Sequence, residues 1–208
     1  ANTLAMEVAG IDARSKSPAG GRIERVAGSQ VPSGVFVDAA EELMTRAIPA
    51  PRPNERDLAL AEAQKVLHRN GITAAADMGT TIEDWQAYRR AGDKGALTLR
   101  IMAYAAGPDQ MELIAGARPS PWLYDDKLRM NGIKIYLDGA LGSRGAWLKQ
   151  PYADDPGNTG LPLTGPAKLR NVLVRAAQGN FQPAIHAIGT AANEDALDAI
   201  IEIAESFP

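Results

Sequence analysis

The sequence predicts an α/β protein that is built on a parallel sheet, and two observations support this fold class. From residue 54 onward, helix-like and strand-like segments alternate strictly. The strand-like segments are also nearly continuous apolar runs, which is typical of parallel strands that are covered by helices. Such a sheet is either open and doubly wound or part of a barrel, since four β/α units make half of a (β/α)8 barrel.

Helix boundaries in this part of the chain are indicated by capping residues and prolines. Asn54 is the predicted N-cap of the first helix, because its side chain can accept a hydrogen bond from a free amide of the first turn. Thr81 is predicted to begin the second helix, with Asp84 three residues later in an arrangement close to a capping box. Pro108 and Pro166 are predicted to open the next two helices, since proline suits the first helical position. The strands expected between these helices are residues 72–79, 96–106, 128–139 and 182–189.

The last two helices are predicted to be amphipathic, because apolar residues recur in both at i, i+3, i+4 and i+7. This spacing is typical of a helix that buries one face. In the earlier helix the stripe consists of Leu169, Val172, Leu173 and Ala176. In the last helix it consists of Leu197, Ile200, Ile201 and Ala204.

Residues 1–53 have a different pattern and are predicted to form a domain apart from residues 54–208. Glycine and proline surround two short β-like pieces, residues 22–26 and 34–38, and a helix is expected at residues 39–47. The segment "IPAPRPN" then follows as a linker. The chain has no initiator methionine and begins and ends at predicted helices, so we expect it to be a piece of a longer protein.

Composition narrows the classes of function. With 208 residues and 45% hydrophobic content, the chain is long enough for one sizeable core. The formal net charge of −3 and the scattered lysines and arginines argue against nucleic acid as a partner. The absence of cysteine excludes disulfides and cysteine nucleophiles, and no apolar run approaches the roughly 18 residues of a membrane span. We expect a cytoplasmic protein that acts on a small molecule and has no membrane partner.

His186 and Lys134 are the candidate functional residues, because polar side chains near the carboxyl ends of parallel strands form the sites of α/β proteins. His186 lies in an apolar strand and is either a buried histidine bonded to a backbone carbonyl or a metal ligand or general base. Gly189, just after that strand, would let a substrate or an ion come close. The only other histidine, His68, is predicted to be structural, since a cation suits the end of a helix.

Lys134 is unusual because it stands in an apolar strand, where an unpaired ammonium costs several kcal/mol. One alternative is a structural lysine, which either extends its ammonium to the strand end or forms an ion pair with Asp138 or Asp77. A second is a nucleophile that forms a Schiff base with a carbonyl substrate. A third is a lysine that captures carbon dioxide as a carbamate and becomes an anionic metal ligand. The spacing of the residues leaves these alternatives open.

Two strings of the sequence resemble a known family. "GIKIYLDGALGSRGAWLKQPYADDPGNTGL" and "PAIHAIGTAANEDALDAI" are similar to the YtcJ-like branch of the metal-dependent amidohydrolase superfamily, which includes N-substituted formamide deformylase. The resemblance runs through the whole chain. It implies a partial TIM-type (β/α)8 barrel of about strands 2 to 5, with residues 1–53 as an inserted subdomain near the barrel mouth.

The resemblance also implies a site and a reaction. Lys134 on strand 4, carboxylated in many members of the family, and His186 on strand 5 correspond to metal ligands. Asp138, Gly139 and Arg144 are expected to line the substrate pocket, beneath a lid made by the loop that follows. The implied reaction is hydrolysis of an amide or related C–N bond in a small molecule, assisted by one or two divalent ions, expected to be zinc.

The remaining ligands of the family lie on strands 1, 6 and 8, which this chain does not contain. We therefore expect the chain by itself to be inactive, and we expect its open sheet edges to favour homo-oligomers. Thr190 stands where the family usually has aspartate, and it is predicted to cap the last helix. The alternative functions are a Schiff-base lyase of aldolase type that uses Lys134, and a non-catalytic α/β module.

Overall fold

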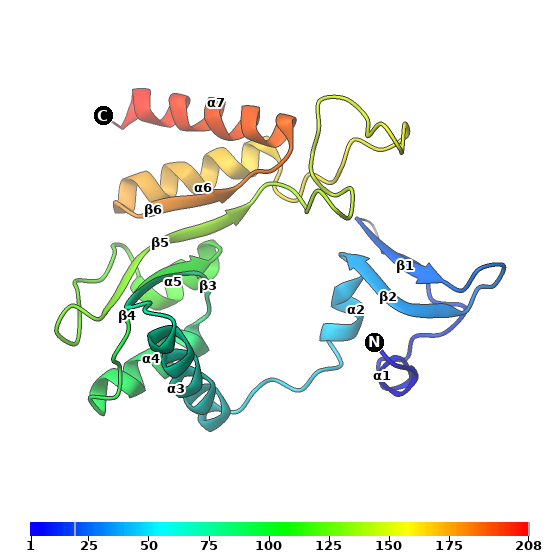
Figure 1. Cartoon of the computed structure of the whole chain (residues 1–208). Helices are drawn as coiled ribbons and strands as arrows, with labels where there is room; N and C mark the ends of the chain where they lie inside the picture. Colours follow the sequence, from blue (N-terminus) through cyan, green and yellow to red (C-terminus); the bar gives the residue numbers. More distant parts are fainter. Residues whose placement is uncertain (19, 208) are drawn as a thin grey trace.

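The computed structural model describes residues 1–18 and 20–207 and contains two separate sheets (Figure 1). One is an antiparallel pair of strands, and the other has four parallel strands in the order β3-β4-β5-β6. The prediction of an α/β fold with a parallel sheet is therefore confirmed, and the four strands form an open sheet. The strands are β1 (Gly21–Arg25), β2 (Pro32–Asp38), β3 (Ala74–Thr80), β4 (Arg100–Ala106), β5 (Leu128–Tyr136) and β6 (Gln182–His186).

The helices alternate with the parallel strands, as the sequence pattern predicts. Helices α4, α5 and α6 each connect two neighbouring strands of the parallel sheet, whereas α3 precedes β3 and α7 follows β6. Figure 1 shows α6 and α7 side by side along β5 and β6. The helices are α1 (Thr3–Val8), α2 (Glu41–Thr45), α3 (Pro53–Arg69), α4 (Ile82–Asp93), α5 (Pro108–Ala115), α6 (Pro166–Gly179) and α7 (Thr190–Ser206).

Three predicted helix starts are confirmed and one is wrong. Thr81 caps α4 in a capping box with Asp84, and prolines open α5 and α6. Helix α3 begins at Pro53 with Arg52 as its N-cap, so Asn54 already lies inside the first turn. Proline at the first helical position sets the helical φ angle in advance. The carboxylate of Glu55 accepts the Arg52 amide at 2.7 Å, which holds the N-cap residue against the first turn.

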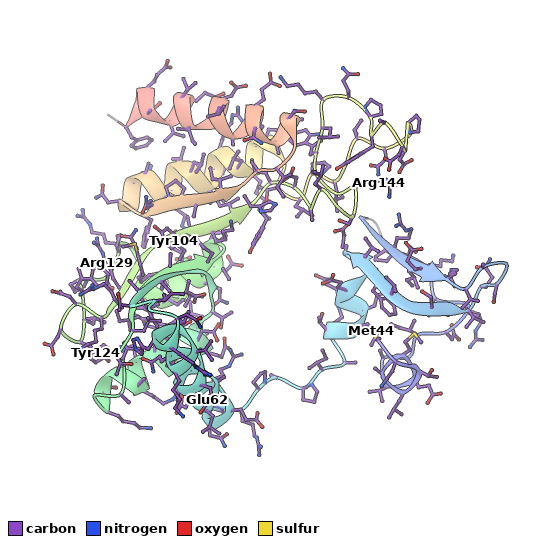
Figure 2. All side chains as sticks on the ribbon, viewed as in Figure 1. Met44, Glu62, Tyr104, Tyr124, Arg129 and Arg144 are labelled. Atoms are coloured by element: carbon purple, nitrogen blue, oxygen red, sulfur yellow. The ribbon has the colours of Figure 1, made fainter. Side chains whose placement is uncertain are left out.

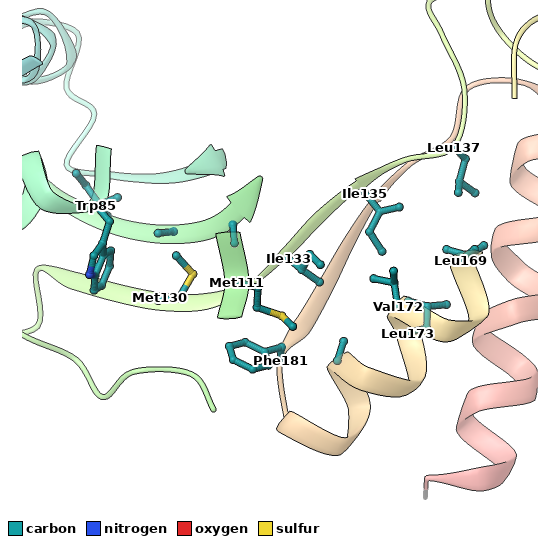
Figure 3. Close-up of a cluster of buried hydrophobic side chains, with 14 of the residues drawn as sticks. Trp85, Met111, Met130, Ile133, Ile135, Leu137, Leu169, Val172, Leu173 and Phe181 are labelled. Carbon is teal, nitrogen blue, oxygen red and sulfur yellow. The ribbon is translucent and has the colours of Figure 1, made fainter. Parts of the chain in front are cut away.

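The main core lies between the parallel sheet and the helices that cover one of its faces. Alternate residues of β5 are buried there, and the same face continues into the segment after the strand. Figure 3 shows these side chains opposite the buried stripe of α6, which confirms the predicted face of that helix. The residues in this contact are Ile133, Ile135 and Leu137 on one side and Leu169, Val172 and Leu173 on the other.

The opposite surface of the sheet, which we call the open face, carries the residues that alternate with the buried ones. Tyr104, Lys134, Tyr136 and His186 define it, because their strand neighbours belong to the core or pack against it. Tyr104, labelled in Figure 2, donates its hydroxyl to Gln182 Oε1 at 2.6 Å and so links β4 to β6 across β5.

The predicted buried stripe of α7 is wrong. Leu197, Ile200 and Ile201 are 59%, 45% and 57% exposed, and Ala204 is exposed as well. The helix instead buries a stripe of small residues, Ala192, Ala196 and Ala199.

Ion pairs between α6 and α7 accompany this rotation of α7. Arg170 of α6 bonds Asp195 Oδ1 at 2.8 Å and Glu202 Oε2 at 2.6 Å, and both acceptors lie on α7. A stripe of alanines lets two helices approach closely, and these ion pairs hold that stripe against α6.

The loop after β5 extends from the parallel sheet to the small sheet (Figure 1). Ser143 in this loop donates its hydroxyl to Asp38 Oδ1 at 3.1 Å, at the end of β2. A polar cavity of about 200 Å³ lies at this contact, lined by Asp38, Arg144 and Asn158 among others.

The division into residues 1–53 and 54–208 stays a prediction. Within the described residues, no helix is both long and apolar enough to cross a membrane.

Candidate active site

Lys134 lies near the carboxyl end of β5, on the open face of the sheet. Its ammonium is 4.7 Å from the centroid of the Tyr136 ring, a cation–π contact between two residues that share this face. Burial lowers the pKa of the Lys134 amine, and no neighbouring carboxylate opposes that shift in the described part of the chain. The lysine is therefore partly desolvated and has no ion-pair partner within residues 1–18 and 20–207.

The ion pairs proposed for Lys134 are not formed, because both candidate carboxylates have other partners. Asp77 points to the helix-covered side, where its Oδ2 accepts hydroxyl hydrogen bonds from Thr80 at 2.6 Å and Tyr88 at 2.8 Å. Asp138 is bonded to backbone amides. A lysine that extends to the strand end, a nucleophile and a carbamate all stay open as alternatives for Lys134.

A cavity of about 280 Å³ lies beside Lys134, at the carboxyl ends of β4 and β5. Gly107, Tyr136, Thr164 and Lys168 line it together with Lys134. Its position is the one at which α/β proteins place their ligands. Tyr136 had no role in the predicted site, although its spacing of two residues from Lys134 places both side chains on one face of the strand.

His186 is the last residue of β6 and pairs with Tyr136 across the strands. The two rings have centroids 5.5 Å apart and are tilted by 44°. Its Nε2 atom is buried, has no hydrogen-bond partner among the described residues, and lies 3.6 Å from Asp138 Oδ1. The alternative of a histidine bonded to a backbone carbonyl is not observed within residues 1–18 and 20–207. Lys134, Tyr136 and His186 therefore form one group on the open face.

Asp138 follows β5 and is 1% exposed. Its carboxylate accepts hydrogen bonds from the amides of Trp147 at 2.9 Å, Ile188 at 3.0 Å and Gly189 at 2.7 Å. These contacts join two segments of the chain. Direct contact of Asp138 with a substrate stays a prediction, because the contacts that the structure shows are all internal.

Gly139 and Arg144 belong to a tight turn beyond Asp138. The Gly139 amide donates to the Gly145 carbonyl at 3.0 Å, and a Cβ on Gly139 would lie 3.0 Å from Gly145 Cα. Arg144 has a φ of 60° and binds Asp154 with two nitrogens, the Nε–Oδ1 distance being 3.1 Å. Arg144 lines the cavity against the small sheet and not the one beside Lys134. A role of either residue in substrate binding stays a prediction.

Gly189 serves an internal contact, which corrects the expectation that it lets a ligand approach. A Cβ on Gly189 would lie 1.8 Å from the Trp147 carbonyl oxygen. This oxygen accepts hydrogen bonds from the amides of Ala191 and Ala192. It thereby satisfies the free amides at the start of α7. Thr190 is the first residue of this helix and not its cap, and its hydroxyl accepts the Lys149 amide at 3.0 Å.

The described residues do not make a complete metal site. No group of three or more His, Cys, Asp or Glu side chains suited to a metal ion occurs among them. Catalytic zinc has three protein ligands as a rule, whereas the group on the open face offers His186 and, if carboxylated, Lys134. His68 lies elsewhere, on α3, with its Nε2 2.9 Å from Thr98 Oγ1, as expected for a structural histidine.

The fold and the site define an α/β protein with an open parallel sheet and polar side chains near the carboxyl ends of two neighbouring strands. The chain belongs to the amidohydrolase family, which it matches over residues 1–206.

Relatives in this family include proteins of plants and bacteria. The chain is 34% identical to the protein LONG AFTER FAR-RED 3 of Arabidopsis thaliana and 31% identical to the putative amidohydrolase YtcJ of Bacillus subtilis. It is 26% identical to the N-substituted formamide deformylase of Arthrobacter pascens. These matches cover 98%, 96% and 96% of the chain but 36%, 38% and 38% of the relatives. The chain thus spans less than half the length of these proteins.

Two solved structures share the fold. Both are uncharacterized metal-dependent hydrolases, one from Pyrococcus horikoshii and one from Pyrococcus furiosus, each with a TM-score of 0.75. Their sequences are 20% and 22% identical to this chain, of which each covers 97%. The chain covers 39% and 40% of those structures.

Proposed function

We propose that this chain is the part of a metal-dependent amidohydrolase that carries two of its metal ligands, Lys134 and His186. The parallel sheet then corresponds to about strands 2 to 5 of a TIM-type barrel, with the open face directed toward the barrel interior. The reaction is hydrolysis of an amide or related C–N bond in a small molecule. Family membership over nearly the whole chain supports the hydrolase class.

One observation carries the assignment of the two residues. Lys134 and His186 lie on the same face of neighbouring strands, at the carboxyl ends, with Tyr136 in contact with both. Ligands of one metal centre in a β/α barrel come from the ends of different strands, and this arrangement places two such side chains together.

The environment of Lys134 suits a carboxylated lysine. Burial lowers the pKa of its amine, so a larger share is neutral and able to attack carbon dioxide. The amine nitrogen bonds to the carbon of carbon dioxide and releases one proton, which leaves an anionic carbamate. Two carbamate oxygens would then serve as metal ligands in place of an ammonium that cannot ligate.

The chain's own residues would hold and shield the site. His186 and carboxylated Lys134 would bind one or two divalent ions, which we propose to be zinc. When bound, such an ion supplies a Lewis acid that polarises a carbonyl and lowers the pKa of water. Asp138, Gly139 and Arg144 would shape the substrate pocket, and the loop of residues 139–165 would limit access of bulk water.

The proposal is tested on the 208-residue chain by metal analysis and hydrolysis assays. We expect less than one zinc per chain and no turnover, because the described residues offer at most two ligands. Stoichiometric zinc with turnover would show that these two residues are not part of a larger ligand set. Borohydride trapping of a carbonyl compound on Lys134 would favour the Schiff-base lyase instead.

A further inference from the structure

The buried carboxylate of Asp138 has one acceptor position that no described hydrogen bond uses. A carboxylate offers about four lone-pair sites. Two of them, on Oδ2, accept the amides of Trp147 and Gly189, and one on Oδ1 accepts the amide of Ile188. Because the side chain is fully buried, water does not readily reach the fourth position.

The fourth position is on Oδ1, the carboxylate oxygen that lies beside His186. Nε2 of this histidine lies 3.6 Å from Asp138 Oδ1, and it is itself buried without a hydrogen-bond partner. A movement of about half an ångström would bring the two atoms to hydrogen-bond distance. An orphaned buried ring nitrogen and an unused carboxylate lone pair thus lie next to each other, and one hydrogen bond would satisfy both.

The three amides show what else Asp138 holds in place. Trp147 belongs to the loop after β5, whereas Ile188 and Gly189 form the turn between β6 and α7. The Trp147 carbonyl in turn accepts amides at the start of α7. Asp138 therefore links the loop to the turn, and it does so next to the His186 ring.

We propose that Asp138 is a positioning residue that fixes His186 as the tautomer with hydrogen on Nε2. The carboxylate accepts that hydrogen, and Nδ1 keeps the ring's lone pair for a ligand. Histidines that bind metals commonly donate their other ring nitrogen to a carboxylate in this way. The use of Nδ1 on a metal rests on the proposed function, whereas the tautomer is a property of the metal-free chain.

The tautomer is measured by nuclear magnetic resonance on metal-free protein with ¹⁵N-labelled histidine. The chain has two histidines, so His68 serves as an internal reference. At about pH 8.5, above the ordinary histidine pKa of about 6.5, we expect His186 to carry its hydrogen on Nε2 alone. We expect this hydrogen to exchange with water at least about tenfold more slowly than the ring hydrogen of His68. A hydrogen on Nδ1 of His186 would overturn the proposal.

The variant Asp138→Asn, matched with Asp154→Asn as a control, assigns the effect to the carboxylate. Asp154 pairs with Arg144 at the surface and touches none of the groups in question. We expect Asp138→Asn to speed exchange of the His186 ring hydrogen and the Gly189 amide about tenfold, and Asp154→Asn to change neither. Unchanged exchange in a folded Asp138→Asn protein would refute the proposal. If this variant does not fold, the tautomer and exchange in the original chain decide alone.

The two proposals fail in different ways. Absence of metal binding at Lys134 and His186 would remove the proposed function and leave the tautomer as it is. If a longer protein that contains this chain binds metal through His186, but His186 carries its hydrogen on Nδ1, only the proposed role of Asp138 is refuted.

Discussion

Replacement of Gly189 by alanine tests whether the loop after β5 is fixed to the start of α7. A Cβ at this position would lie 1.8 Å from the Trp147 carbonyl oxygen and 2.3 Å from its carbon. Real Cβ atoms stay at least 3.0 Å from such atoms, so the loop backbone would have to retreat by more than an ångström. No side-chain rotation can relieve this contact, because the Trp147 atoms that the Cβ would meet belong to the backbone.

The cost follows from the contacts that the retreat breaks. Overpacking against an unyielding neighbour costs about 1–3 kcal/mol. The amides of Ala191 and Ala192 would lose the Trp147 carbonyl, at about 1 kcal/mol for each hydrogen bond. We therefore expect the free energy of unfolding to fall by about 3–5 kcal/mol.

Urea unfolding followed by tryptophan fluorescence measures this loss. Gly157→Ala is the matched control in the same loop, because a Cβ there meets nothing within 4 Å and we expect a change below about 0.5 kcal/mol. If Gly189→Ala were as stable as Gly157→Ala, the close approach of Trp147 to α7 would be wrong.

Three further predictions concern the sheets and one ion pair. Gly132→Ala should lower the unfolding free energy by about 3 kcal/mol in urea titration, because its Cβ would lie 1.9 Å from the Gln182 carbonyl; a loss below about 0.5 kcal/mol would contradict the β5–β6 register. We propose that the chain self-associates through the open edge of β3. Sedimentation should then show dimers, and Ala76→Lys should weaken them. Monomers both for the original chain and for this variant would refute the proposal. Hydrogen bonds from Arg90 lower the pKa of Asp57, so this carboxylate stabilises the fold above its ordinary pKa of 3.8 and the contribution is lost as pH falls through the lowered pKa. Asp57→Asn should therefore reduce the fall in unfolding free energy on acidification below about pH 4, and an unchanged acid dependence would exclude the pair as its source.

The order of the helices and strands could be predicted from the sequence, because capping residues and prolines act within a few residues of a helix end. The capping box of Thr81 and the proline at Pro108 each depend on the first turn of one helix, and both are confirmed. In β5, Lys134 alternates with the buried residues and lies on the opposite face, because side chains in a strand point to two faces.

Contacts between distant segments could not be predicted in the same way. In α7 a stripe of leucine and isoleucine and a stripe of alanines both recur with helical spacing, and the sequence of the helix alone does not say which of them is buried against other elements. The three amides on Asp138 come from residues 9, 50 and 51 positions away, and such pairings leave no local pattern. Gly189 was expected to let a substrate or an ion come close, but the group that approaches it is the Trp147 backbone, which is distant in the chain and leaves no local signal.

The central claim is that Lys134 and His186 are two ligands of a metal site completed by other strands of a longer protein. The most direct measurement is the metal content of a folded chimera in which this chain replaces the matching part of Bacillus subtilis YtcJ, to which it is 31% identical. We predict about one or two divalent ions per chimera, lost in Lys134→Ala and in His186→Ala but kept in Lys168→Ala, which changes a lysine of the same cavity. Full metal content in the Lys134 and His186 variants would contradict the claim.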